Sequence, residues 1–415
     1  MKVLYLTNAL THYYNLVLSK LNLDSDIELV CVVPRGNRSA LVGEGVSLTQ
    51  EGASFKVIEL DEASRFFSLY YTYKNLADVI KIEKPDVVVV LLPYLPSFLF
   101  ELSLIRLRKV MNFALILKDH PFRLNRYNEE LQNIRLCNKV FVSISKNTNK
   151  LIYISGLYKI MRRVQLEVRR RSFLLADAHV NYIEASDILC SYGVNPEQLF
   201  VTRNSPDTDA IFAQKARLIR LPKLFPSNPY RVIHVGRLVG WKKVDLLIRA
   251  IAKVKKRYPS VELLILGTGP EEEPLKKLAN KLNLSESVNF LGAIYDQRLG
   301  QCLMESSLYV LAGMGGLSIN DAMAYGLPVL CSTCDGTEKF LVREKVNGRF
   351  FKEDDTRDLA LKICWFFNDL KNTKKMGMES EKIIKNEINI HTVIDVYKKA
   401  FEYAFDKIRN FPNMR

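Results

Sequence analysis

The stretch of sequence that decides the fold covers residues 311–330 and reads LAGMGGLSINDAMAYGLPVL. Its pattern predicts a strand that ends at Ala312, a glycine-rich turn, a helix over 317–325 and a second strand that begins at Val329. A strand, a helix and a strand in this order form the repeating unit of a parallel sheet. The stretch therefore predicts an α/β fold.

The same alternation extends outward on both sides. Short β-rich apolar runs alternate with segments of helical spacing, as expected for strands and helices of parallel sheets. In the second half the predicted strands are 231–236, 262–267, 288–291, 308–312 and 329–332, with further helices at 243–257 and 270–282. In the first half the predicted strands of one sheet are 1–7, 27–33, 55–59, 87–92, 114–117, 139–144 and 178–180.

The alternation fails between the two halves, where Pro206, Pro222 and Pro226 break any long element. We therefore predict two doubly wound, Rossmann-like domains that face a cleft. Ligands of such sheets bind at the carboxyl ends of the strands, so the site is expected between the domains. The predicted parts are a first domain over 1–205, a linker over 206–228, a second domain over 229–390 and an amphipathic helix over 391–415 that packs back on the first domain.

Charge and composition limit the kind of protein. The chain has 415 residues, with 60 Lys and Arg against 45 Asp and Glu, a net charge of +15. Residues 101–175 hold 16 basic and 5 acidic residues, a net +11 (16 − 5), so the first domain is expected to meet an anionic partner. No basic and aromatic stripe accompanies this charge, which argues against nucleic acid. The longest apolar run, 87–100, is too short to span a bilayer, which needs about 20 residues.

The seven cysteines are scattered and odd in number, which favours a reducing, cytoplasmic setting. Cys331 and Cys334 have the spacing of half a zinc or redox site. Because no second pair or histidine cluster accompanies them, no metal site is expected.

Two loops of the second domain have the chemistry of a diphosphate site. Gly313, Gly315 and Gly316 follow a predicted strand, and glycines in such a turn let backbone amides approach an anion. Arg237 and Lys242 follow another strand of the same sheet and could neutralise a leaving diphosphate. Each loop also has a plainer interpretation, as a tight connection or a solvated basic loop. Their occurrence in one domain favours the anion site.

The order of these motifs resembles the nucleotide-sugar domain of retaining glycosyltransferases with the GT-B fold, family four (glycosyl transferases group 1). The resemblance is strongest over residues 230–350. It implies metal-independent transfer of a sugar from a nucleoside diphosphate sugar, with retained anomeric configuration and no bound cofactor. The motifs that carry it are Gly236-Arg237-Leu238, Leu266-Gly267-Thr268-Gly269-Pro270, Phe290-Leu291-Gly292, Gly316-Leu317 and Asp321 through Val329.

The resemblance also implies roles for individual residues. Arg237 and Lys242 match the pair that contacts the diphosphate. Gly313 stands where the family has a glutamate for the donor sugar, and Asp321 stands where it has a glutamate for the ribose. The plainer roles are a place on the helix surface for Asp321 and an anchor of its loop for Glu338. The donor-binding candidates are Gly236, Gly315, Gly316, Leu317, Asp321 and Glu338.

On the acceptor side, His120 follows the strand that ends at Leu117, where the family often has a histidine at the cleft. This makes His120 a catalytic candidate beside Arg237 and Lys242, and its plainer role is a structural one, paired with Asp119 or with backbone. The arginines at 162–163 and 169–171 lie in a segment of helical spacing that would rest on anionic lipid or face solvent.

These features predict a glycosyltransferase that moves a sugar from a nucleoside diphosphate sugar to a glycan or a lipid-linked acceptor, in cell-surface polysaccharide or glycolipid synthesis. A cytoplasmic protein, peripheral at the inner membrane face, is expected. Within the same fold, an epimerase or a phosphorylase is an alternative. A binding module that holds a nucleotide sugar or a partner protein without turnover is an alternative of another class, which Gly313 and Asp321 keep open.

Overall fold

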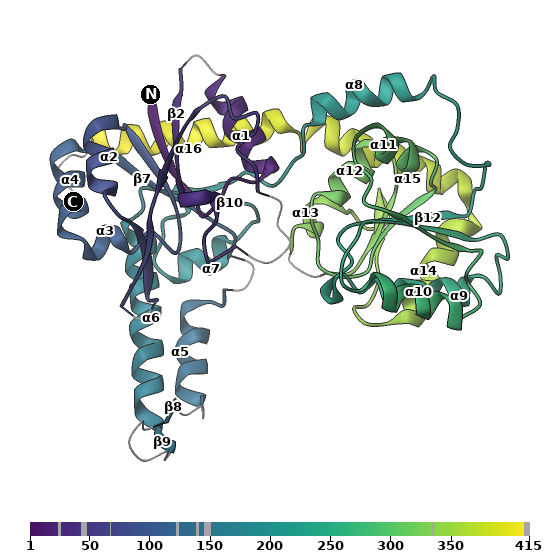
Figure 1. Ribbon diagram of the computed structural model, residues 1–415, viewed down its shortest axis with the longest axis horizontal. Helices are drawn as coiled ribbons and strands as arrows, with labels where there is room; N and C mark the ends of the chain where they lie inside the picture. Colours follow the sequence, from purple (N-terminus) through teal and green to yellow (C-terminus); the bar gives the residue numbers. More distant parts are fainter. Residues whose placement is uncertain are drawn as a thin grey trace. The chain divides into compact units, whose positions relative to one another are not determined.

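The computed structural model describes residues 1–415 apart from 24–25, 43–47, 67, 122–123, 138–140, 145–150, 334–335 and 411–415, and apart from the side chains of 141–144, 151–155 and 296. The chain divides into two compact units. Unit 1 comprises Met1–Thr202 and Ile394–Arg415, and unit 2 comprises Arg203–Val393. Each unit contains its own parallel sheet (Figure 1).

Unit 1 is built on a seven-stranded sheet with the order β11-β10-β7-β6-β1-β2-β3, in which every pairing is parallel. Strand β6 shows why these residues form a central strand, because its Val-Val-Val-Val run is buried on both faces. The chain order reverses between the neighbouring strands β1 and β6. The strands are β1 (Lys2–Leu6), β2 (Glu28–Pro34), β3 (Lys56–Leu60), β6 (Val87–Leu91), β7 (Ala114–Asp119), β10 (Ala178–Asn181) and β11 (Leu199–Val201).

The helices of unit 1 cover this sheet, and two of them form an arm. Figure 1 shows α5 and α6 extending from the unit side by side. The arginines predicted to share one helix, 162–163 and 169–171, do lie on α6. The helices are α1 (His12–Asn22), α2 (Leu76–Glu83), α3 (Ser97–Phe100), α4 (Leu102–Met111), α5 (Tyr127–Leu136), α6 (Ser155–Leu175) and α7 (Ser186–Ser191), with short 3-10 turns at Arg35–Asn37 and Pro196–Gln198.

One predicted strand of the parallel sheet is wrong. Phe141–Ile144 form β8, which pairs antiparallel with β9 (Leu151–Ile154) in a separate hairpin, and β10 occupies the place beside β7 instead. Figure 1 places the hairpin at the far end of the arm, where no strand of the sheet is available to it. Two apolar runs that are close in sequence then pair with each other. A second hairpin, β4 (Glu62–Arg65) and β5 (Tyr70–Tyr73), was not predicted.

Unit 2 repeats the scheme with a six-stranded parallel sheet of order β14-β13-β12-β15-β16-β17. The chain order reverses between β12 and β15. The strands are β12 (Arg231–Val235), β13 (Glu262–Leu266), β14 (Val288–Gly292), β15 (Leu308–Leu311), β16 (Val329–Cys331) and β17 (Gly348–Phe350). The helices are α8 (Thr208–Leu218), η4 (Gly240–Lys242), α9 (Val244–Val254), α10 (Glu272–Lys281), α11 (Asp296–Met304), α12 (Ser318–Ala324), α13 (Glu338–Leu341), α14 (Thr356–Asn368) and α15 (Leu370–Asn386).

The last helix, α16 (Ile390–Asn410), carries the chain back to unit 1 from Ile394 onward. Its buried residues Tyr397, Phe401, Ala404 and Ile408 recur every three or four positions, so they form one apolar stripe. The backbone carbonyl of Ile408 accepts a hydrogen bond from the Asn112 side chain at 3.4 Å. None of the helices in the described part of the chain combines the length and the apolar character that crossing a bilayer requires.

Candidate functional site

The two predicted diphosphate loops lie side by side in unit 2. The loop at 236–242 follows β12, the loop at 313–317 follows β15, and these two strands are paired. The backbone N–H of Met314 donates to the carbonyl oxygen of Trp241 at 3.0 Å. Chain order reverses between the two strands, and ligands of open α/β sheets bind at the carboxyl ends of strands at such a point.

Lys242 holds the two loops together. Its Nζ donates to the carbonyl oxygens of Met314 at 2.8 Å and Gly315 at 2.7 Å, and the residue is only 8% exposed. These bonds show that Lys242 positions the glycine loop. Its predicted contact with a diphosphate stays a prediction.

The loop that follows β13 packs against the loop at 236–242 with almost no space between the two backbones. Leu238 N donates to Thr268 O at 2.9 Å. A Cβ atom added at Gly267 would lie 1.9 Å from the carbonyl oxygen of Gly236, and one at Gly269 would lie 2.3 Å from that of Leu238. These glycines of the Leu266-Gly267-Thr268-Gly269 motif are therefore needed for the close approach of two backbones.

Arg237 is the exposed cation of the first loop. Its Cζ lies 5.7 Å from the centroid of the half-exposed Trp241 ring. A guanidinium on an aromatic face still presents its N–H groups in the plane, where they can form paired hydrogen bonds to phosphate oxygens. Sequence reasoning missed Trp241. The feature that could have indicated it is a large aromatic residue between Gly240 and Lys242 in a short polar turn.

Gly313 has no room for a side chain. A Cβ atom there would lie 2.1 Å from the Trp241 carbonyl oxygen and 2.7 Å from the Lys242 carbonyl carbon. The position that the resemblance assigns to a donor-sugar glutamate is thus occupied by the backbone of η4. The departure from the family pattern that the resemblance implies at Gly313 stays a prediction.

Asp321 lies in the first turn of α12, four residues after Leu317. It is half-buried, and its carboxylate accepts no hydrogen bond from the described residues. Burial raises the pKa of Asp321 to about 7. Tyr309 on β15 donates its hydroxyl to Oγ of Ser318, the first residue of α12, at 2.7 Å. This bond fixes the start of the helix.

Glu338 is 1% exposed, and its Oε1 accepts a hydrogen bond from the Gly336 backbone N–H at 3.2 Å. This contact is the loop anchor that the sequence analysis gave as the plainer role. A donor contact of Glu338 stays a prediction. The neighbouring Asp335 and Cys334 lie outside the described residues.

His120 belongs to unit 1, where it follows β7. Its backbone N–H donates to Asp119 Oδ1 at 2.8 Å, and its ring meets that of Tyr182 edge to face at 5.7 Å. Burial raises the pKa of Asp119 to about 6, and the His120 N–H opposes this shift. Lys118, which sequence reasoning missed, is fully buried beside them, with Nζ 3.3 Å from the centroid of Tyr182.

The described residues do not gather into a possible metal site, since no three His, Cys, Asp or Glu side chains come together among them.

Comparison with known proteins identifies the domain that these loops belong to. Residues 216–383 match the family described as "Glycosyl transferases group 1". The chain therefore carries a domain of this family, as the resemblance predicted. The matched segment includes the loops at 236–242, 267–271 and 313–317 and the helix with Asp321.

Two curated relatives match part of the chain. An uncharacterized glycosyltransferase of Haemophilus influenzae is 29% identical over 179 residues, which is 42% of this chain and 50% of that protein. The putative colanic acid biosynthesis glycosyltransferase WcaL of Escherichia coli is 26% identical over 154 residues, 35% of this chain and 38% of that protein. The chain thus spans about half the length, or less, of these relatives.

The fold is shared over the whole chain. The crystal structure of Anabaena HepE in complex with UDP covers 97% of this chain and 100% of its own, with a TM-score of 0.67 and 17% sequence identity. This likeness and the two Rossmann-like parallel sheets show the GT-B fold, which confirms the predicted fold class.

Proposed function

We propose that this chain is a glycosyltransferase that moves a sugar from a nucleoside diphosphate sugar to a glycan or lipid-linked acceptor. The observation that carries the proposal is the gathering of Arg237, the glycine loop and Asp321 where the order of the unit 2 sheet reverses. These residues also lie within the segment that matches the glycosyl transferases group 1 family.

In this proposal the donor lies along the loops of unit 2. The guanidinium of Arg237 binds the diphosphate, and the backbone amides of Gly315, Gly316 and Leu317 complete its cradle. Lys242 holds that cradle in shape through its bonds to Met314 and Gly315. Gly236 leaves space at the strand end for close approach of the donor.

Asp321 is the proposed ribose ligand. A half-buried carboxylate that accepts no bond from the described residues can accept hydrogen bonds from two vicinal hydroxyls. HepE was solved with UDP and also with UDP-glucose. These structures of a protein with the same fold make a uridine nucleotide the first ligand to test here.

The proposed reaction retains the anomeric configuration and needs no metal. Charge develops on the diphosphate as its bond to the sugar breaks, and Arg237 stabilises that charge in place of a divalent cation. The leaving phosphate takes the acceptor proton, so no protein nucleophile is required. His120 is the proposed contact of unit 1 with the reacting groups, through hydrogen bonds that its imidazole can form to the donor sugar or the acceptor.

The acceptor is proposed to be a glycan or a lipid-linked sugar of cell-surface polysaccharide or glycolipid synthesis. The net +11 of residues 101–175 supports an anionic acceptor or membrane lipid. The name of WcaL, a relative in colanic acid biosynthesis, supports a polysaccharide pathway. We place the protein, as part of the proposal, at the cytoplasmic face of a membrane as a peripheral enzyme.

The donor site is tested by thermal shift of the full chain with a panel of nucleoside diphosphates and nucleotide sugars. A ligand that binds only the folded state raises the melting temperature. One nucleotide is expected to give a selective shift that Arg237→Ala removes. Lys256→Ala, which removes an exposed cation from the C-terminal side of α9, is the matched control and should keep the shift. If no nucleotide binds at millimolar concentration, the donor site is wrong.

Gly313 supports a second candidate, a module that binds a nucleotide sugar without turnover. The resemblance implies a donor-sugar carboxylate at this position, and the η4 backbone leaves no space there for a side chain. Incubation with a radiolabelled nucleotide sugar and a membrane extract separates the two candidates. An enzyme transfers label to a glycan or lipid and loses this with Arg237→Ala, whereas a binding module gives the thermal shift with no transfer.

A further inference from the structure

The loop at 236–242 exposes a large aromatic side chain at the proposed donor site. The ring of Trp241 is 49% exposed, and neither of the two apolar cores described in unit 2 includes it. Trp365, the other tryptophan of the chain, has the opposite setting, because it packs against one of these cores. Trp241 is therefore an exposed ring that the described cores do not use, and such a ring is available to a ligand.

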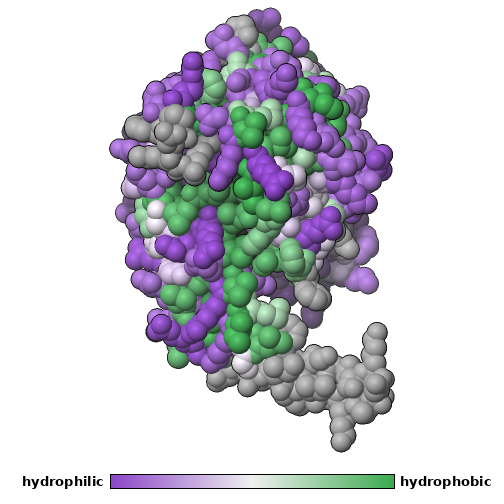
Figure 2. Space-filling view, turned by 90° about the vertical axis from the view of Figure 1, so that its left-hand side faces the viewer, coloured by the Kyte–Doolittle hydropathy of each residue, from purple (hydrophilic) through white to green (hydrophobic). Residues whose placement is uncertain are grey.

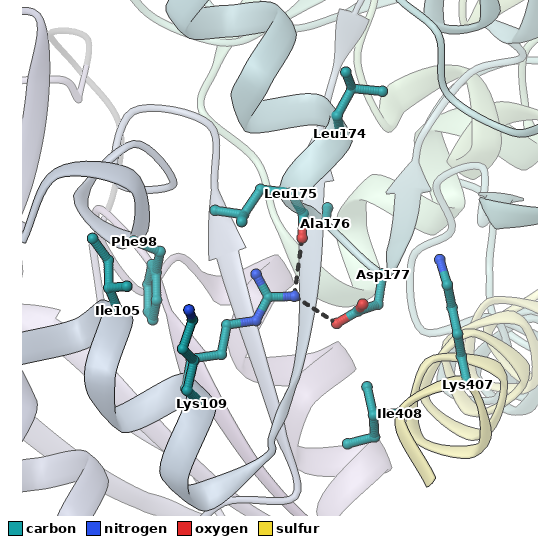
Figure 3. A pocket seen from close by; sticks show the side chains of 10 residues that line it. Phe98, Ile105, Lys109, Leu174, Leu175, Ala176, Asp177, Lys407 and Ile408 are labelled. Atoms are coloured by element: carbon teal, nitrogen blue, oxygen red, sulfur yellow. Dashed lines mark hydrogen bonds and ion pairs between the residues drawn. The ribbon is translucent and has the colours of Figure 1, made fainter. Parts of the chain in front are cut away.

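Unit 1 shows apolar surface of a different kind, gathered in clusters. Figure 2 views the end of the molecule that carries α4 and shows hydrophobic residues gathered in a band between hydrophilic ones. A cavity of about 400 Å³ with mainly apolar walls lies beside Arg108, whose guanidinium donates to Asp177 Oδ2 at 3.0 Å (Figure 3). Trp241 in unit 2 has a cation, Arg237, as the neighbour of its ring instead.

Backbone contacts hold Trp241 in place. Its carbonyl oxygen accepts a hydrogen bond from the Met314 N–H at 3.0 Å. The backbone N–H of Lys242, the next residue, donates to the Val239 carbonyl oxygen at 2.9 Å. The Lys242 side chain joins the same turn to the glycine loop. Because the turn is already ordered, a ligand that meets the indole does not have to order this backbone first.

The position of Arg237 places the ring near the donor sugar. In the proposed function this guanidinium binds the diphosphate, and the sugar is bonded to the diphosphate. A ring whose centroid lies 5.7 Å from the Cζ atom of Arg237 is therefore within reach of that sugar. The proposed ribose ligand, Asp321, lies on a different element, α12, so the nucleoside end of the donor has its own contact.

The glycine loop gives a reason for an aromatic contact. The resemblance implies a carboxylate at position 313 that binds hydroxyls of the donor sugar. No side chain fits there, because a Cβ atom at Gly313 would lie 2.1 Å from the carbonyl oxygen of Trp241. The sugar then needs another contact. The residue that closes this position, Trp241, is also the one that offers an exposed ring beside it.

We propose that Trp241 is a specificity-determining residue that stacks on the apolar face of the donor sugar. This role rests on the proposed function, because it requires that the donor lie along these loops. The face of an aromatic ring carries partial negative charge, so it attracts the polarised C–H groups of a neutral sugar and repels a carboxylate. Since Arg237 is assigned to the diphosphate, the site is expected to take a neutral hexose or deoxyhexose rather than a uronic acid.

Titration calorimetry of the full chain with UDP and with UDP-glucose tests this role. Trp241→Met, which keeps an apolar side chain but removes the ring, should weaken UDP-glucose binding about tenfold and leave UDP binding within about twofold. Trp241→Phe keeps a ring and should restore most of the affinity. Trp365→Phe, which removes the other indole, is the matched control and should bind both ligands as the wild type does.

The two proposals fail in different ways. Equal weakening of UDP and UDP-glucose binding in Trp241→Met, or unchanged binding of both, would overturn the role of the ring while the donor site stands. If the wild type binds no nucleotide in the thermal-shift panel, the proposed function fails and this role fails with it. If the panel selects another base, its diphosphate and its hexose conjugate take the place of UDP and UDP-glucose.

Fluorescence and a charged donor give a second readout. In the Trp365→Phe variant, Trp241 is the only tryptophan. A sugar stacked on the ring displaces water, so UDP-glucose should shift the emission further toward the blue than UDP does. UDP-glucuronic acid should bind the wild type more weakly than UDP-glucose, by a factor that Trp241→Met reduces. An emission shift that is equal for UDP and UDP-glucose, or a preference for UDP-glucuronic acid, would contradict stacking on a neutral sugar.

Discussion

At the scale of single residues, Lys118 is the clearest case of a charge placed where water cannot reach it. It is 1% exposed, and its Nζ donates no hydrogen bond to the described residues. The ring centroids of Tyr182 and Tyr397 lie 3.3 and 5.7 Å from this nitrogen. Burial lowers the pKa of Lys118 well below its usual value of 10.5. The ring faces attract the charged form and partly offset this shift.

We predict that Lys118→Met stabilises unit 1 at neutral pH. Unfolded Lys118 binds a proton that the folded side chain gives up, so the wild-type free energy of unfolding rises with pH up to about 10.5. The gain from Lys118→Met should therefore be largest near pH 7 and shrink toward pH 10. Urea unfolding at several pH values measures it, with the exposed Lys253→Met as control. A gain that does not change with pH would show that Lys118 is charged in the folded protein.

Asp321 makes a second prediction at this scale. Its pKa of about 7 means that the free protein carries the protonated form below neutral pH and the carboxylate above it. Since the carboxylate is the better acceptor for ribose hydroxyls, the affinity for UDP-glucose should rise as pH increases through about 7. A sugar nucleotide is used because its diphosphate has no terminal phosphate that titrates. Titration calorimetry should find this rise in the wild type and in the exposed control Asp245→Asn, and a flat profile in Asp321→Asn.

At the scale of elements, the proposed donor site is built by loops that bind one another through backbone. The loops after β12, β13 and β15 are joined by Leu238 N to Thr268 O and by Met314 N to Trp241 O. Glycines stand where the backbones meet, and Lys242 closes the assembly from one side. The geometry offered to a diphosphate therefore depends on backbone contacts between these loops, which also set the place of the Arg237 side chain.

We predict that Gly313→Ala damages the site although it adds only one methyl group. Its Cβ would lie 2.1 Å from the Trp241 carbonyl oxygen, so η4 or the glycine loop must shift. Overpacking of this kind costs about 1–3 kcal/mol. The nucleotide-induced thermal shift should be lost or strongly reduced. Gly240→Ala is the matched control in the same region, because nothing lies within 4 Å of its added Cβ. Equal behaviour of the two variants would contradict the role given to this contact.

At the scale of the whole molecule, the chain folds as two units with separate cores. Phe401 on α16 is 1% exposed and belongs to unit 1, although it lies about 200 residues beyond Thr202, where the first part of that unit ends. Phe366 on α14 is fully buried in unit 2. The stability of unit 1 thus depends on the last helix of the chain.

We predict that the two cores respond separately to truncation. Phe401→Ala and Phe366→Ala should each cost about 3–5 kcal/mol in their own unit. Calorimetry should show a lower melting transition of unit 1 with Phe401→Ala, and of unit 2 with Phe366→Ala. A nucleotide should raise only the transition of unit 2. A single transition that both substitutions lower equally would instead indicate cooperative unfolding of the two units.

Much of the fold follows from local sequence. The alternation of β-rich runs and helical spacing predicts both parallel sheets, because strands buried on both faces need continuous apolar residues such as Val87–Leu91. The same local rule misplaced 139–144, since an apolar run alone does not specify its partner strand. The glycine motifs and Arg237 also predicted which loops of unit 2 carry the candidate site.

Tertiary structure alone decided how those residues act. The direction of the Lys242 ammonium toward two carbonyls, the absence of space at Gly313 and the partial burial of the Asp321 carboxylate depend on atoms contributed by distant loops. The same holds for the burial of Lys118 and for the cavity beside Arg108 and Asp177, whose walls come from residues 98 to 408. Sequence by itself determined most strands and helices of the two parallel sheets, because backbone conformation and burial pattern are largely local properties. Contacts, desolvation and cavities arise only when separate elements pack together, so only the folded chain reveals them.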